Sequence, residues 1–113
     1  MLDAYRQAVE TEPYCSGDCM ETQARQDAVI EIGSTGIRLL VADITASGDW
    51  AVVDRAERAL ALGRDVFTAG VITRESLIQC LTILNRYREI LAGWGIPDER
   101  VSVVGTSAIR EAK

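Results

Sequence analysis

A glycine-rich loop with an acidic residue just before it is the part of the sequence best suited to chemistry. Glu31 lies in the otherwise apolar run 28–32. The loop that follows is Gly33, Ser34, Thr35 and Gly36. Glycines adopt backbone angles closed to other residues and let a ligand come close, and a concave turn of backbone N–H groups binds anions such as phosphate. Glu31 could then hold a metal ion or polarise water, whereas the alternative is a plain β-hairpin turn with Glu31 in solvent.

A second polar junction follows an apolar run near residue 104. Its residues are Gly105, Thr106 and Ser107, with Arg110 three positions further on. A helix that begins just past the carboxyl end of a parallel strand is a favourable phosphate site, because its first N–H groups are free. Thr106 or Ser107 would cap that helix. The same residues also suit an ordinary strand-to-helix junction.

Three strands are expected to position the first loop. Apolar runs at 28–32 and 37–44 flank it, and a third strand is predicted at 50–60 after a short turn cluster. Consecutive strands with short connections predict an antiparallel meander. Residues 62–70 contain two glycines and are expected to form an irregular connection, with Phe67 as a plug into the core.

A helix is predicted at 74–92, capped by Thr73 and ended by the glycines after it. Its predicted core-facing stripe is Leu77, Ile78, Leu81, Leu84, Ile90 and Leu91, with Tyr87 or Arg88 bridging the gap. A short strand at 100–105 follows. A strand, a crossover helix and a strand imply that this last strand runs parallel to its partner.

Composition sets the broad class of the protein. The chain has 113 residues, enough for one domain, and its net charge of −5 argues against a nucleic-acid polymer as partner. It has neither a membrane-length apolar run nor a secretory signal, so a cytoplasmic protein without a membrane partner is expected. Residues 1–26 are expected to be an extension, disordered in part, that precedes the domain at 27–113. Cys15 and Cys19 lie in it, and four zinc ligands are hard to find there because the chain has no histidine and no second cysteine pair.

Three stretches, in order, resemble the exopolyphosphatase/guanosine pentaphosphate phosphohydrolase family. They are residues 28–41 with the first loop, residues 57–67 after the third strand, and residues 103–112 with the second junction. The resemblance implies an α/β fold of the ribonuclease H-like, actin-like ATPase type, shared with Hsp70 and sugar kinases. The chain would form a half-domain, with an antiparallel three-strand meander followed by a helix and a parallel strand.

The resemblance also implies an activity and a set of site residues. The family hydrolyses phosphoanhydrides with Mg²⁺ and removes a terminal phosphate from inorganic polyphosphate or, in ppGpp metabolism, guanosine pentaphosphate. Glu31 takes the catalytic, metal- and water-positioning place where the family usually has aspartate. The implied phosphate-binding residues are Gly33, Ser34, Thr35, Gly36, Arg38, Arg64, Gly105, Thr106, Ser107 and Arg110.

The sequence departs from the family in ways that lead to alternatives. Glu31 is one methylene longer than the usual aspartate, Thr35 stands where asparagine is common, and Gly36 where a hydroxyl residue is common. The family's catalytic glutamate and second phosphate loop follow the last motif found here, so an N-terminal fragment, inactive alone, is expected. The alternatives are a non-catalytic module that binds polyphosphate or a nucleotide, and a sugar-kinase-like protein. Uncovered sheet edges and helix faces predict self-association.

Overall fold

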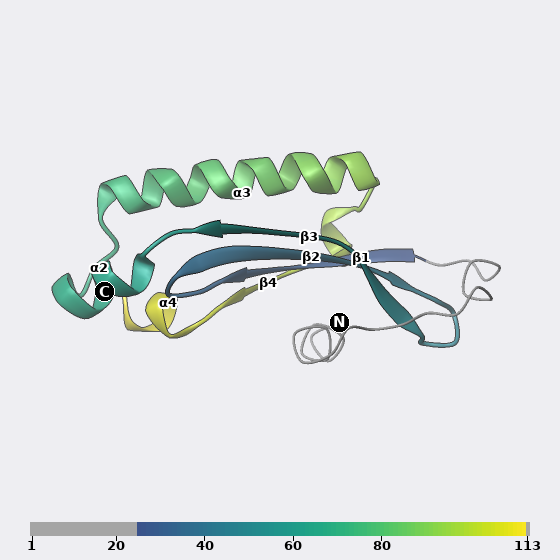
Figure 1. Cartoon of the computed structure of the whole chain (residues 1–113), viewed down its shortest axis with the longest axis horizontal. Coiled ribbons are helices and arrows are strands. Elements are labelled where there is room, and N and C mark those ends of the chain that lie inside the picture. The colour runs from purple at the N-terminus through teal and green to yellow at the C-terminus, as the bar shows by residue number, and fades with distance from the viewer. Residues whose placement is uncertain (1–24, 113) are drawn as a thin grey trace.

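The fold is a four-stranded sheet with one long helix lying along one face (Figure 1). The computed structural model describes residues 25–112. The strands are β1 (Arg25–Ile32), β2 (Gly36–Ile44), β3 (Trp50–Ala59) and β4 (Val101–Gly105), in the order β3-β2-β1-β4. β1, β2 and β3 form the predicted antiparallel meander, and β4 runs parallel to β1. The predicted fold class is therefore confirmed.

The first strand is longer than its apolar run. Arg25, Gln26 and Asp27 precede the predicted start, and all three pair with the end of β2. Gln26 Nε2 donates a hydrogen bond to Asp43 Oδ1 at 2.8 Å across this pair. Polar residues can therefore extend a strand when a partner strand is present, which an apolar run does not reveal. Most of the predicted N-terminal extension, with Cys15 and Cys19, lies outside the described residues.

The predicted irregular connection at 62–70 is wrong, because this segment is a helix. α2 (Leu62–Ala69) buries Leu62 and Val66, which lie one turn apart, and ends at Gly70 with φ +77°. Phe67 points away from this face and is 63% exposed, so it does not plug the core. Two glycines suggested a loop, but Gly63 lies in the first turn and Gly70 just past the end, where glycine is compatible with a helix.

The long helix α3 (Arg74–Trp94) has the predicted cap. Thr73 Oγ1 accepts a hydrogen bond from Ser76 N at 3.2 Å, and Gly95 ends the helix with φ +70°. A single turn of 3₁₀ helix, η2 (Asp98–Arg100), then leads into β4, and α4 (Ser107–Glu111) follows that strand. Among the described residues, no helix is long and apolar enough to cross a membrane.

The predicted core stripe of α3 is wrong in its first half. Leu77, Ile78 and Leu81 are each about half exposed. The buried positions are Ser76, Cys80, Tyr87 and Leu91, and Leu84 and Ile90 pack half-buried against them, as predicted. Apolar side chains occupy more than one face in the early turns of the helix. Periodicity alone therefore does not identify the face that meets the sheet.

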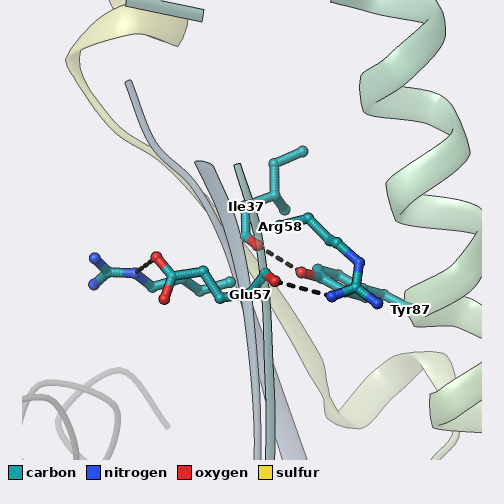
Figure 2. A network of polar contacts seen from close by, with 5 residues as sticks. Ile37, Glu57, Arg58 and Tyr87 are labelled. Carbon is teal, nitrogen blue, oxygen red and sulfur yellow. Dashed lines mark hydrogen bonds and ion pairs between the residues drawn. The ribbon is translucent and has the colours of Figure 1, made fainter. Parts of the chain in front are cut away.

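The core lies between α3 and one face of the sheet. Alternate strand residues supply it, among them Ala28, Ile30, Ile37, Leu39 and Val41. Tyr87 donates a hydrogen bond from its hydroxyl to Ile37 O at 2.6 Å, which ties the helix to β2 (Figure 2). Because side chains alternate along a strand, the residues between these positions, Glu31 and Arg38 included, belong to the opposite face.

Candidate phosphate-binding site

The loop between β1 and β2 is a tight turn in which close packing requires glycine at Gly36. Gly33 N donates to Gly36 O at 2.9 Å and closes the turn. Neither glycine has a positive φ, so the expectation that they adopt angles closed to other residues is wrong. A Cβ atom on Gly36 would instead lie 2.8 Å from Arg58 O. Real Cβ atoms do not approach that closely, so only glycine fits beside β3.

Helix α2 and Leu60, two residues before it, hold the loop from one side. Leu60 N donates to Thr35 O at 3.0 Å, and Gly63 N donates to Ser34 O at 2.8 Å. The carbonyl oxygens of Ser34 and Thr35 therefore both accept hydrogen bonds from the chain. Within residues 25–112, the backbone N–H groups of Ser34 and Thr35 donate to no other backbone group. Two adjacent amides are therefore available to an anion.

Gly63 is a contact residue that sequence reasoning missed. A Cβ atom there would lie 2.8 Å from Ser34 Cβ and 3.2 Å from Ser34 O. The stretch 57–67 was singled out by resemblance, but no role was given to this glycine. A glycine inside a helical turn lowers the stability of the helix. The close approach of the loop to α2 explains why a glycine stands there.

The carboxylate of Glu31 and the hydroxyl of Thr106 both lie near Gly33, at the start of the loop. A Cβ atom on Gly33 would lie 3.4 Å from Glu31 Oε1 and 3.8 Å from Thr106 Oγ1. Thr106 is held there by two bonds to Ile32 O, one from its N at 3.0 Å and one from its hydroxyl at 3.3 Å. The parallel pairing of β1 with β4 thus brings the two predicted motifs together, as expected of parallel strands that end at one edge.

The second motif does not cap its helix as predicted. Thr106 occupies the N-cap position of α4, but its hydroxyl bonds to Ile32 and caps no backbone N–H. Helix α4 has only five residues, so its N-terminal dipole is weak. Ser107 is half-buried, whereas Gly105 and Arg110 are exposed. These three residues lie next to the site, but the loop is its better-defined part.

The two predicted arginines have different surroundings. Arg38 lies opposite Glu31 on β1 and opposite Glu57 on β3, and its Nε contacts Glu57 Oε1 at 3.2 Å (Figure 2). Both side chains are about half exposed, so this pair adds little stability. Arg64 is exposed on α2, next to Gly63. Among the described residues it makes no hydrogen bond to the loop, so its predicted role is not supported by a contact.

A buried carboxylate of α2 lies at the junction of that helix with α3. Asp65 Oδ2 accepts a hydrogen bond from Thr73 Oγ1 at 2.9 Å, at the junction of α2 with α3. Side-chain hydrogen bonds from Ser76 and Thr73 lower the pKa of Asp65. This residue anchors the helix that holds the loop. An acidic residue in a predicted loop carried no signal for that role.

Glu31 is the candidate metal ligand of this site. Within the part of the chain that the structure describes, no three His, Cys, Asp or Glu residues gather into a metal site. Mg²⁺ commonly binds through one or two carboxylates and takes its remaining ligands from substrate phosphates and water. A single carboxylate beside free amides therefore fits a metal held mainly by the phosphate it accompanies.

The chain is similar to curated exopolyphosphatases and to solved structures. No model of a known protein family matches the chain. The sequence is 37% identical to exopolyphosphatase 2 of Mycobacterium tuberculosis, in a match that covers 74% of this chain and 27% of the relative. The chain thus spans about a quarter of the length of the curated relatives it matches.

Solved structures share the fold. A Ppx/GppA family member from Aquifex aeolicus has a TM-score of 0.72 at 29% identity, over 80% of this chain and 28% of that one. An exopolyphosphatase from Cytophaga hutchinsonii has a TM-score of 0.71 at 29% identity, over 79% and 28%. In sequence and in fold this chain is similar to proteins of the Ppx/GppA family, and its fold is of the actin-like ATPase type.

Proposed function

We propose that the loop between β1 and β2 binds the terminal phosphate of inorganic polyphosphate in a hydrolase of exopolyphosphatase type. One observation carries this: within residues 25–112 the N–H groups of Ser34 and Thr35 have no backbone acceptor, and the Glu31 carboxylate and the Thr106 hydroxyl lie near Gly33, the residue before them. Amides and hydroxyls suit phosphate oxygens, and a carboxylate suits Mg²⁺. The similarity to exopolyphosphatase 2 supports polyphosphate as the substrate.

The chemistry proposed is hydrolysis of a phosphoanhydride. Water adds to the terminal phosphorus, its oxygen forms the new P–O bond, and the bond to the leaving chain breaks. The loop amides stabilise charge that develops on the terminal oxygens. Glu31 orients the water or holds Mg²⁺, which neutralises phosphate charge when it is bound. Arg38, on the same face of the sheet, is available to contact the next phosphate.

Guanosine pentaphosphate is the alternative substrate. It presents a terminal phosphoanhydride of the same kind, so the loop alone would serve either molecule. We expect this chain by itself to bind phosphate chains without hydrolysing them, because it spans only 27% of the related enzyme. Phosphate release at the rate of a full-length enzyme would contradict that expectation. A cytoplasmic location stays a prediction.

A non-catalytic polyphosphate- or nucleotide-binding module is the second candidate. The observation that favours it is Glu31, which replaces the usual aspartate of the resemblance and carries its carboxylate one methylene further, close to Gly33. Placement matters on a scale of about 1 Å in an active site. Such a protein would bind the same phosphate chains without Mg²⁺.

Calorimetric titration with a short polyphosphate, with and without Mg²⁺, distinguishes the two. For the hydrolase, Mg²⁺ should tighten binding by the wild-type chain, and Glu31→Gln should remove that gain while it keeps the metal-free affinity. Glu99→Gln is the matched control, since Glu99 is an exposed glutamate in η2, outside the proposed site. If the affinity of the wild type is the same with and without Mg²⁺, the non-catalytic module is favoured. If polyphosphate does not bind at all, both candidate functions are excluded.

A further inference from the structure

A groove between β3 and α3 lies outside the phosphate loop. Its volume is about 300 Å³, and its lining residues are Ala56, Arg58, Arg86, Tyr87, Glu89 and Ile90. Arg58 lies opposite Ile37 in the sheet, so it belongs to the face that α3 covers. Glu31 and Arg38 belong to the other face. A ligand in the groove would therefore not touch the Glu31 side of the proposed site.

Arg58 is held in position within the groove. Its Nη1 donates to Glu57 O at 3.2 Å, and its side chain extends beside Tyr87, on the opposite side of the sheet from the Glu57 carboxylate (Figure 2). Tyr87 is itself fixed by its bond to Ile37 O. A guanidinium that is already positioned loses less side-chain freedom when it binds a ligand. Its flat face can also stack on an aromatic ring.

Arg86 supplies a second cation across the groove. It is exposed on α3 and, among the described residues, makes neither a hydrogen bond nor an ion pair, although Glu89 lies one turn further along the helix. Two arginines and one glutamate give the groove a formal charge of +1, in a chain of net charge −5. Such a local reversal of charge attracts anions, and paired guanidiniums suit phosphate.

The other lining residues indicate which chemical groups, besides phosphate, a ligand of the groove would have. Ala56 and Ile90 are half-buried and offer apolar surface, and Glu89 offers a hydrogen-bond acceptor. An inorganic phosphate chain has no apolar part, and Glu89 would repel it. A ligand with phosphate, a flat apolar ring and hydroxyl or amino donors uses all three features.

We propose that this groove is a second binding site, for a nucleotide. The phosphates contact Arg58 and Arg86, the base lies on Ala56 and Ile90 and against the Arg58 guanidinium, and Glu89 accepts from a ribose hydroxyl or a base amino group. This site does not depend on polyphosphate binding at the loop.

Binding can be followed by NMR of the 113-residue chain, with the Ile90 and Ala56 methyl groups as reporters of the groove. ATP without Mg²⁺ should shift both signals, and Arg86→Ala should weaken that binding by about tenfold because it removes a charged contact. Arg88→Ala is the matched control, since Arg88 is an exposed arginine on the same helix outside the groove, and it should change affinity less than twofold. Arg86 is exposed and makes no hydrogen bond or ion pair within residues 25–112, so we expect its replacement to leave the fold intact.

Two other ligands test the chemical class. Tripolyphosphate carries the phosphates without the base. We expect its affinity for the groove, followed by the same methyl signals, to be at least about tenfold lower than that of ATP, because it makes no apolar contact with Ala56 and Ile90. Adenosine carries the base without phosphates and should bind more weakly than ATP as well. The proposal would be overturned if ATP and tripolyphosphate bound the groove with equal affinity. It would also be overturned if Arg88→Ala lost as much ATP affinity as Arg86→Ala, or if ATP did not shift the groove methyl signals.

Discussion

Gly36 and Gly63 shape the phosphate loop by the space that they leave to other atoms. Gly36 allows the backbone of Arg58 to approach, and Gly63 allows Ser34 to lie against α2. Close packing and a need for unusual backbone angles both select glycine, so the residue type alone does not distinguish the two reasons. Glu31 and Thr106 were identified from the sequence, but their meeting at Gly33 depends on the pairing of β1 with β4.

We predict that Gly63→Ala destabilises the protein and weakens phosphate binding together. The added Cβ would lie 2.8 Å from Ser34 Cβ, which cannot swing aside like the end of a flexible side chain. Overpacking of this kind typically costs about 1–3 kcal/mol. Urea denaturation measures the loss of stability, and titration with polyphosphate measures the loss of affinity.

Gly93→Ala is the control for that variant. Gly93 lies inside α3, has no atom within 4 Å of an added Cβ, and lacks a positive φ. Alanine there should leave polyphosphate binding unchanged and stabilise the helix by up to about 1 kcal/mol. Equal urea midpoints for Gly63→Ala and the wild type would show that α2 does not press on the loop.

The elements divide into those that local pattern determines and those that their neighbours determine. The three meander strands and α3 follow from apolar runs, turn residues and the Thr73 cap. Helix α2 does not, because its stability comes from burying Leu62 and Val66 and from its attachment to the loop. The face of α3 that contacts the sheet was predicted correctly only in the second half of the helix. There Leu84, Ile90 and Leu91 lie on a single apolar face.

We predict that Asp65 makes stability fall at low pH. Hydrogen bonds from Ser76 and Thr73 lower the pKa of Asp65 in the folded state, whereas an unfolded Asp has a pKa of roughly 3.9. The folded state thus binds the proton less readily. The contribution is fully present above the unfolded pKa and is lost as pH falls through the folded pKa.

Asp65→Asn removes this titration while it keeps the size of the side chain. Urea unfolding between pH 5 and pH 2, a range chosen to bracket roughly the unfolded value, should show a steeper loss of stability in the wild type than in the variant. Asp98→Asn is a matched control, because Asp98 is exposed in η2 and the stability of that variant should fall with pH as steeply as that of the wild type. Parallel curves for wild type and Asp65→Asn would contradict the role given to this carboxylate.

Across the whole molecule, apolar surface is exposed on α3 and on β4. Leu77, Ile78 and Leu81 project from the first half of the helix, and Val103 of β4 is 61% exposed at an edge of the sheet. Exposed apolar surface and free strand edges favour association between chains. Self-association, expected from the sequence, stays a prediction for this chain.

Light scattering over a range of concentrations measures that association. We expect the mass to rise with concentration for the wild type, and Leu81→Lys to reduce the rise because it places a charge on the exposed helix face. Gln79→Lys is the control, since it adds the same charge at an exposed polar position of the same helix. A monomeric mass at every concentration would reject the prediction, as would an equal effect of the two variants.

The central claim concerns the whole arrangement of sheet, loop and α2: the free amides of Ser34 and Thr35 bind the terminal phosphate of a phosphate chain. Amide NMR of the 113-residue chain during titration with a short polyphosphate tests it directly. The account predicts that Ser34 and Thr35 show the largest amide shifts and that Gly63→Ala reduces them, whereas Gly93→Ala does not. Saturable polyphosphate binding that leaves the amides of Ser34 and Thr35 unmoved would contradict it.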